Sequence, residues 1–247
     1  MVVETQVESK KREVGRELGK SIVLFSGGPD SLAALEVALT ESEVIGLVHL
    51  LRSPGRSQEA AFLLALEYSL PLVTISYSSS LPANYFAPLK SRIPYLPDRN
   101  LLFLTLASIY VKSTFFGASS IYTGFCLTGR ETEGTESYDV SEEFVGRLNS
   151  VLILDQTWPL QVRAPYAGRP KIEVISDLLY RFLSPVHLTW SCYVEEPDGG
   201  FPCGRCAGCQ HRIEAFREAG VQDPLKYYDK LDWPGCISWE EYRDGVA

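Results

Sequence analysis

The feature that most restricts the fold is the hexapeptide SGGPDS at residues 26–31, which stands between an apolar run and a helix-forming stretch. Residues 21–25 (SIVLF) are typical of a short strand, and residues 32–40 (LAALEVALT) are rich in helix formers. Glycines here let the backbone turn and approach an anion closely, and a helix N-terminus offers free N–H groups. An ordinary capped turn is the alternative, but the strand–loop–helix order favours a phosphate-binding loop.

Apolar runs alternate with helix-forming stretches along most of the chain. Further strands are expected at residues 44–51, 72–76, 120–125 and 160–164, and further helices at residues 58–68, 99–115, 141–152 and 171–182. This alternation predicts an α/β fold with a doubly wound parallel sheet that helices cover on both faces. Residues 78–97 and 126–139 are rich in Pro, Ser or Gly, and we expect loops there.

Four of the six cysteines are closely spaced near the C-terminus. They are Cys192, Cys203, Cys206 and Cys209. In a reducing compartment such clustering indicates metal ligation, and four thiolates predict a closed, structural zinc site with no open position for catalysis. An iron–sulfur centre is the alternative, which ligand count and spacing favour less than zinc. Cys126 and Cys236 stand apart and are typical of small packed side chains.

The composition argues against several classes of protein. A net charge of −8 disfavours broad binding to a nucleic-acid backbone, which requires a basic surface. No stretch approaches the ~20 apolar residues that span a bilayer. The first 20 residues are polar and mixed in charge, without the apolar core of a signal peptide. We therefore expect a cytoplasmic protein that does not associate with a membrane.

The loop and the cysteine cluster together carry a family resemblance. SGGPDS resembles the Ser-Gly-Gly-x-Asp-Ser loop of the ATP-pyrophosphatase superfamily, whose Rossmann-type, adenine nucleotide alpha-hydrolase-like domain cleaves ATP between its α and β phosphates. TWSCY at residues 189–193 and CGRCAGCQHRIEAF at residues 203–216 resemble the C-terminal segment of the 7-cyano-7-deazaguanine synthases. Further motifs similar to that family are PDRN at residues 97–100, AP at 164–165 with KIEVI at 171–175, and DPL at 223–225. The resemblance covers residues 20–228.

The resemblance implies two parts in the chain. Residues 1–185 would form the ATP-pyrophosphatase domain, with residues 1–20 as an N-terminal extension, and residues 186–247 would form a small zinc-binding subdomain and tail. The implied cofactors are ATP, Mg²⁺ and Zn²⁺. The loop residues expected to bind ATP are Ser26, Gly27, Gly28, Asp30 and Ser31. Asp30 suits a Mg²⁺ contact or a helix cap, since its carboxylate would repel a bare polyphosphate.

Three residues are implied as catalytic: Asp30, Arg99 and Lys171. Lys171 would stabilise phosphate charge in the transition state, although its sequence context alone is typical of a solvated helix residue. The context of Arg99 alone fits a surface residue at a capped helix start equally well. The residues implied to contact the substrate are Arg99, Asn100, Tyr138, Asp139 and Trp190.

Two segments depart from the family pattern. The family's Tyr-Gly-Gln-Arg-His run after the second strand is replaced by LRSPGRSQE at residues 51–59. Its Asp-x-x-Gly-Tyr-Pro-Asp-Cys segment is replaced by EGTESYDVS at residues 133–141, where Tyr138 and Asp139 are the remnants. The nucleotide-binding half is intact and the substrate-binding half has diverged, which leaves the final acceptor open.

The function implied by the resemblance is ATP-dependent ligation. The enzyme would adenylate the carboxylate of 7-carboxy-7-deazaguanine, release pyrophosphate, and pass the activated group to ammonia to give an amide and then 7-cyano-7-deazaguanine, a step of queuosine biosynthesis. One alternative is a related enzyme of anti-phage defence operons that joins the activated deazaguanine to an amine of a partner protein encoded nearby. A weaker alternative is a zinc-ribbon tRNA-modifying enzyme such as a tRNA thiolase. Thiolases usually need a catalytic cysteine pair, and the Cys-x₂-Cys pairs in this sequence are expected to bind the metal. The resemblance also allows a homodimer.

Overall fold

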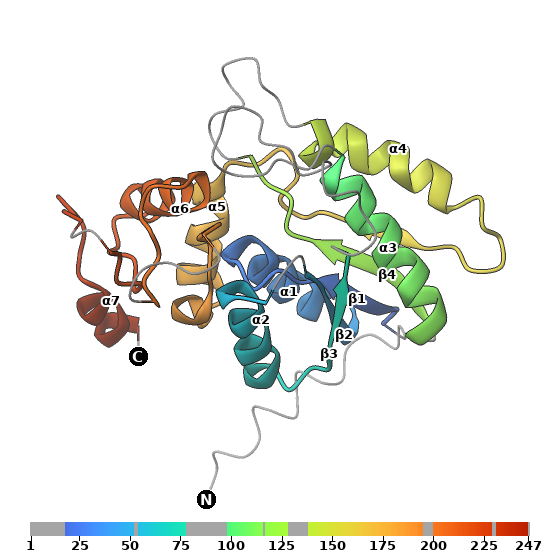
Figure 1. Ribbon diagram of the computed structural model, residues 1–247, viewed down its shortest axis with the longest axis horizontal. Coiled ribbons are helices and arrows are strands. Elements are labelled where there is room, and N and C mark those ends of the chain that lie inside the picture. The colour runs from blue at the N-terminus through green and yellow to red at the C-terminus, as the bar shows by residue number, and fades with distance from the viewer. Residues whose placement is uncertain are drawn as a thin grey trace, which may run out of the picture.

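The computed structural model describes residues 18–51, 54–77, 98–115, 117–127, 138–194, 200–228 and 231–246. Within these residues, five parallel strands form one sheet in the order β3–β2–β1–β4–β5 (Figure 1). The strands are β1 (Lys20–Leu24), β2 (Glu43–Leu51), β3 (Leu72–Ser76), β4 (Ala118–Thr123) and β5 (Gln161–Arg163). The α-helices are α1 (Pro29–Glu41), α2 (Arg56–Glu67), α3 (Arg99–Thr114), α4 (Glu142–Leu152), α5 (Lys171–Ser176), α6 (Ala207–Glu218) and α7 (Trp239–Val246). Short helical turns are η5 (Tyr138–Val140), η6 (Asp177–Arg181) and η7 (Val186–Leu188).

The sheet is doubly wound. From β1 the chain moves through β2 to β3 on one side, and it then places β4 and β5 on the other side of β1. Helices α1, α2 and α5 cover one face, and α3 and α4 cover the other (Figure 1). The direction of winding therefore changes between β1 and β4. Open α/β sheets bind ligands at such a point, beyond the carboxyl ends of the strands.

Each face of the sheet has its own apolar core. On the first face, Leu35 of α1 packs in one cluster with Leu64 of α2. On the second face, Leu104 of α3 packs in another cluster with Ile121 of β4 and Val145 of α4. The central strands are apolar along most of their length because both of their faces are buried. No helix in the described part of the chain is long and apolar enough to cross a membrane.

The C-terminal part of the chain packs against the first face. Phe216 of α6 is fully buried in the same core as Leu35 of α1, and Tyr242 of α7 reaches that core as well. Three of the clustered cysteines form a separate small core with Ile213 of α6. The division of the chain at residue 185 stays a prediction, and residues 1–17 of the expected N-terminal extension lie outside the described residues.

The predicted fold class is confirmed, because the sheet is parallel, helices cover both faces and a cysteine cluster lies near the C-terminus. Strand β4 ends at Thr123 rather than at residue 125, just before Gly124, which lies against the start of α1. The helix expected at residues 171–182 is divided into α5 and the π-helical η6, whose wider turn is closed by Phe182 N–H donating to Asp177 O (2.9 Å). The loop expected at residues 78–97 lies outside the described residues.

Gly124 lies at the closest contact between the end of β4 and the start of α1. A Cβ atom at Gly124 would lie 2.2 Å from the backbone O of Asp30 and 2.6 Å from the backbone N of Ser31. These backbone atoms cannot move without shifting α1. Glycine at this position therefore sets how closely α1 packs on the sheet.

We expect Gly124→Ala to lower the free energy of unfolding by about 2 kcal/mol or more, because the added methyl group overlaps helix backbone. Urea denaturation measures the change. Gly146→Ala in α4 is the matched control, since nothing lies within 4 Å of its Cβ position and alanine should raise stability by about 0.5–1 kcal/mol. Equal stability of Gly124→Ala and the parent would contradict the close packing.

Candidate functional site

The loop at residues 26–31 joins β1 to α1 and is held against α2. Gly27 has a φ of +79°, and a Cβ atom there would lie 2.6 Å from Ala61 N and 2.6 Å from Ser57 O. Any residue with a side chain at position 27 would be strained by the left-handed φ and would clash with these backbone atoms. The first glycine of the loop is therefore required by the turn and by the contact with α2.

The N-terminus of α1 has no side-chain cap among the described residues. Its N-cap is Gly28, and Leu32 N–H donates to Gly28 O (3.1 Å) in the first turn. The Ser31 hydroxyl is buried and donates to Gly28 O (2.9 Å), and the Ser26 hydroxyl donates to Ser31 Oγ (3.2 Å). An uncapped helix N-terminus presents backbone N–H groups and a favourable dipole to an anion. The arrangement suits a phosphate group, with Ser31 holding the shape of the loop.

Asp30 in the first turn of α1 and Lys171 at the start of α5 form an ion pair. Nζ of Lys171 lies 2.6 Å from Oδ1 and 2.7 Å from Oδ2 of Asp30. Burial disfavours the ammonium of Lys171, but the charge and hydrogen bonds of Asp30, together with Cys126 and Tyr193, outweigh this effect and raise the pKa of Lys171. The structure thus brings two of the three catalytic candidates together.

Two sequence-based alternatives for this pair are wrong. The Lys171 side chain is only 10% exposed and is ion-paired, so it is not a solvated helix residue. Asp30 does not cap α1, because the N-cap position is occupied by Gly28 and Asp30 follows inside the first turn. Both side chains therefore belong to the candidate site and not to the helix surface.

Tyr193 is a site residue that the sequence analysis did not single out. Its hydroxyl is desolvated by burial, which raises the pKa of Tyr193, and it lies in the field of the charges of Arg99, Lys171 and Asp30. The Tyr193 ring packs on α6, where a Cβ atom at Gly208 would lie 3.0 Å from ring atom Cε1. The residue as a whole is 48% exposed. Its place beside Cys192 in the TWSCY motif was the one signal in the sequence.

The third catalytic candidate, Arg99, is the first residue of α3 and is exposed. It acts on the site through its charge, which lowers the pKa of the Tyr193 hydroxyl against the opposing effect of burial. Arg99 therefore lies within electrostatic range of Tyr193, as do Lys171 and Asp30.

Asn100, Asp139 and Tyr138 contact neighbouring protein groups. The buried Asn100 donates from Nδ2 to Asp139 O (3.2 Å) and from its backbone N to Asp139 Oδ2 (3.4 Å). The Tyr138 hydroxyl donates to Asp98 Oδ1, and Tyr138 is 55% exposed. These bonds join the start of α3 to η5. Residues 133–137 of the divergent segment at residues 133–141 lie outside the described residues.

The four clustered cysteines meet at one point. Their Sγ atoms all lie within 4.8 Å of one another. The backbone N–H groups of Cys206 and Tyr193 donate to Cys203 Sγ and Cys206 Sγ, each at 3.4 Å. Hydrogen bonds with the Cys192 and Cys209 thiols lower the pKa of Cys206, and the same contacts raise the pKa values of Cys192 and Cys209, so the cluster stabilises one thiolate, at Cys206. Four converging thiol groups fit a tetrahedral metal ion, as the spacing of the cysteines in the sequence predicted.

Trp190 lies between the cysteine cluster and the loop. Its backbone N–H donates to Gly27 O (2.9 Å), and its indole Nε1–H donates to Cys192 O (3.1 Å). The residue expected to contact the substrate is thus partly committed to protein contacts. Through Trp190, the metal-ligand candidate Cys192 is two hydrogen bonds from the loop.

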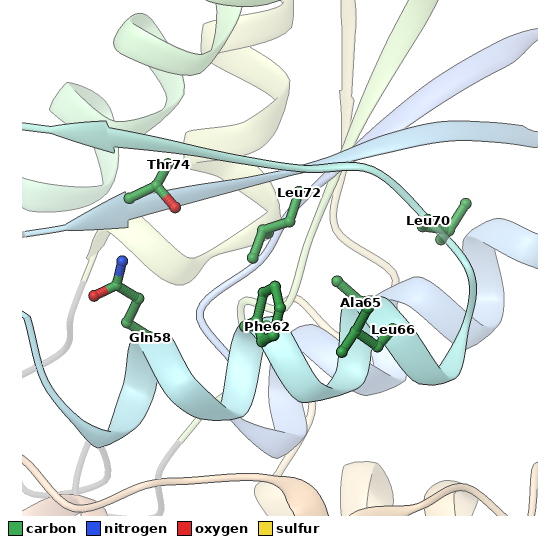
Figure 2. A pocket seen from close by; sticks show the side chains of 7 residues that line it. All are labelled: Gln58, Phe62, Ala65, Leu66, Leu70, Leu72 and Thr74. Carbon is green, nitrogen blue, oxygen red and sulfur yellow. The ribbon is translucent and has the colours of Figure 1, made fainter.

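An apolar hollow of about 200 Å³ lies between α2 and the edge strand β3, away from the Asp30–Lys171 pair (Figure 2). It is lined by Gln58, Phe62, Ala65, Leu66, Leu70, Leu72 and Thr74. Figure 2 shows Phe62 of α2 and Leu72 of β3 at its centre. Its lining contains no charged or titratable side chain, so it offers no group for phosphate or carboxylate chemistry.

His49 near the end of β2 supports the start of the loop. Its Nδ1–H donates to Phe25 O (2.8 Å), the backbone carbonyl just before Ser26. His49 is 3% exposed, and its Nε2 atom has no hydrogen-bond partner in the described part of the chain. Burial lowers the pKa of His49 although the bond to Phe25 opposes this shift. The imidazole is therefore neutral in the folded protein at neutral pH.

Known proteins resemble this chain over most of its length. The family model described as "Queuosine biosynthesis protein QueC" matches residues 71–220. A 7-cyano-7-deazaguanine synthase of Methanothrix thermoacetophila is 30% identical over 235 residues, which cover 85% of this chain and 99% of the relative. The synthase of Caldicellulosiruptor bescii is 29% identical over 235 residues, with 87% of this chain and 100% of the relative covered. The synthase of Archaeoglobus fulgidus is 28% identical over 242 residues, which cover 91% of this chain and 96% of that relative.

We expect acid to destabilise the protein partly through His49. Its folded pKa is depressed, so as pH falls through about 6.5 the unfolded chain takes up a proton that the folded chain does not. The free energy of unfolding should therefore fall between pH 7 and pH 5.5, and less steeply in His49→Asn, whose amide can still donate toward Phe25 O. Urea denaturation at several pH values measures the two slopes. Identical slopes for parent and variant would contradict a neutral, buried His49.

Proposed function

Because this chain belongs to the QueC family of queuosine biosynthesis proteins, whose members are ATP-dependent ligases, we propose that it adenylates the carboxylate of 7-carboxy-7-deazaguanine. The activated acyl group then passes to a nitrogen nucleophile. With ammonia, the first product is the amide, and a second round of adenylation and elimination converts the amide to 7-cyano-7-deazaguanine.

The observation that carries this proposal is the placement of an uncapped helix N-terminus beside a charged Asp–Lys pair at the switch point of the sheet. Gly28 is the N-cap of α1, and Lys171 Nζ lies 2.6 Å from Oδ1 of Asp30 in the first turn of the same helix. A helix N-terminus and an ammonium together favour the negative charge of a pyrophosphate leaving group. This arrangement suits cleavage of ATP between its α and β phosphates.

We assign the chain's own residues to the following roles. The N–H groups of Gly27, Gly28, Asp30 and Ser31 hold the β and γ phosphates, and Ser26 and Ser31 maintain the loop. Asp30 is placed to hold Mg²⁺, which would supply charge neutralisation on the phosphates when bound. Lys171 turns from Asp30 toward the phosphates, and Arg99 adds positive charge from the other side. The carboxylate oxygen attacks the α-phosphorus, the bond to the β-phosphate oxygen breaks, and pyrophosphate leaves.

We propose that the four cysteines hold one Zn²⁺ ion with a structural role. Four thiolates complete a tetrahedral site and leave no position for a substrate or water. The zinc site and residues 189–193 would then shape the substrate pocket, with Trp190 and Asn100 as members. A cytoplasmic location, which the composition favours, and a homodimer, which the resemblance implies, are further proposals.

The divergent segments favour a second candidate for the acceptor. Residues 51–59 and 133–141 depart from the family pattern, and Asn100 and Asp139 bond to each other. In this candidate function an amine of a partner protein, encoded nearby in an anti-phage operon, replaces ammonia as the nucleophile. The adenylation step is the same in both cases.

Incubation with ATP, Mg²⁺ and 7-carboxy-7-deazaguanine tests the proposal. We expect AMP and pyrophosphate, because the loop binds the β and γ phosphates as the leaving group. With ammonia, mass spectrometry should detect the amide or the nitrile for the biosynthetic function. A mass increase on a co-encoded protein would support conjugation instead. ADP as the sole nucleotide product would overturn both, since the α–β bond would then be intact.

We expect Lys171→Met and Asp30→Asn each to lower the rate of AMP formation by about 100-fold or more, since each removes a charge that acts on the phosphates. The double variant should regain stability, because it leaves no unpaired buried charge, and should stay inactive. Arg169→Met is the control, because its ion pair with Glu173 is exposed and long at 3.6 Å. A parental rate in either single variant would contradict the assignment.

A further inference from the structure

Residues 189–193 contact the loop through their backbone. Trp190 N–H donates to Gly27 O (2.9 Å), and Trp190 O lies 3.3 Å from where a Cβ atom at Gly28 would be. Gly27 C=O and Gly28 N–H belong to one planar peptide unit. A hydrogen bond that holds the carbonyl therefore also fixes the direction of Gly28 N–H, which is at the N-cap of α1 and donates to Ser26 Oγ (3.3 Å).

The same segment is fixed to the cysteine cluster on its other side. Ser191 O would lie 2.1 Å from a Cβ atom at Gly208, so the backbone of residues 189–193 lies directly against α6. Cys192 is one of the four converging cysteines, and Tyr193 N–H donates to Cys206 Sγ (3.4 Å). A change in the geometry of the cysteines moves this segment directly.

Arg212 of α6 holds the beginning of the segment. It is fully buried, and it donates to both carboxylate oxygens of Asp223 (2.6 and 3.0 Å). It also donates from Nη1 to Thr189 Oγ1 (2.6 Å) and from Nη2 to Val186 O (3.3 Å). The planar guanidinium donates to all of these groups simultaneously, whereas a lysine ammonium has no such planar set of donors. Arg212 thus ties α6 to the residue before Trp190.

We propose that residues 189–193 couple metal binding at the four cysteines to pyrophosphate binding at the loop, with Arg212 as a positioning residue. The inference rests on the proposed function. Metal binding fixes Cys192 and Tyr193, the segment fixes the Gly27–Gly28 peptide, and that peptide holds the N-cap of α1, where the anion binds. Because linkage is reciprocal, a bound anion must stabilise the metal site by the factor by which the metal strengthens anion binding.

The test uses the intact zinc-loaded protein, which should contain about one zinc per chain. Transfer of zinc to a coloured chelator is timed with and without inorganic pyrophosphate and Mg²⁺, and pyrophosphate binding is measured by calorimetry. We expect pyrophosphate to slow zinc release about fivefold or more. Preparations without zinc, or equal release rates under saturating pyrophosphate, would overturn the coupling.

A pair of variants isolates the hydrogen bond to Gly27. Trp190→Pro removes the backbone N–H, and Thr189 already has the φ of −79° and ψ of 152° that a residue before proline prefers. Trp190→Ala removes the same side chain and keeps the N–H. We expect the slowing of zinc release to persist in Trp190→Ala and to be lost in Trp190→Pro. Persistence in both variants would contradict the proposed route.

A second pair tests Arg212. Arg212→Lys keeps the charge but not the planar set of donors, so the effect of pyrophosphate on zinc release should shrink while zinc content stays at one per chain. Arg217→Lys, on the same helix but exposed, should behave like the parent. If Arg212→Lys does not fold, the Trp190 pair still decides the matter. If the parent binds no pyrophosphate, the proposed function fails, whereas normal binding with uncoupled zinc release removes this inference alone.

Discussion

The ion pair between Asp30 and Lys171 joins two segments that are 141 residues apart in the sequence. Asp30 belongs to the first turn of α1, and Lys171 begins α5. The pair therefore fixes the start of α5 beside the uncapped N-terminus of α1. Removing one member would leave a largely buried charge without its partner, which is costly in a protein interior. The pair therefore holds the loop, the N-terminus of α1 and the start of α5 as one unit before a ligand arrives. Tyr193 lies within reach of the charges of this unit and of Arg99.

Two glycines allow this unit to lie close to its neighbours. Gly27 brings the loop against α2, and Gly124 brings the end of β4 against the first turn of α1. Both contacts are between backbone atoms, which rotamer changes cannot relieve. Since β1 and β4 flank the point where the winding reverses, the loop opens into the crevice that a doubly wound sheet provides. Sheet topology and local glycine contacts thus place the uncapped helix N-terminus beside Lys171.

The predictable parts of the protein were those encoded by short-range patterns. The loop at residues 26–31 and the cysteine spacing are local, and alternating strands and helices restrict the topology to a few forms. The contacts of Lys171 were not predictable from its neighbours, because its partner is distant in the sequence and a lysine at a helix start is ordinarily solvated. Tyr193 and His49 were missed for a related reason: an aromatic or a lone histidine in a partly apolar run carries no signal of its burial or of the charges around it.

Attack by the substrate carboxylate on the α-phosphorus of ATP leaves a mark in the product, because the attacking oxygen becomes part of the phosphate. The most direct measurement is the mass of AMP formed from unlabelled ATP and a 7-carboxy-7-deazaguanine whose carboxylate carries ¹⁸O. Transfer of the acyl group to nitrogen breaks the bond between carbon and that oxygen. We predict that each AMP released by acyl transfer carries one ¹⁸O atom from the carboxylate. AMP without the label would show that another nucleophile attacked the phosphorus, and it would contradict adenylation of the carboxylate at this site.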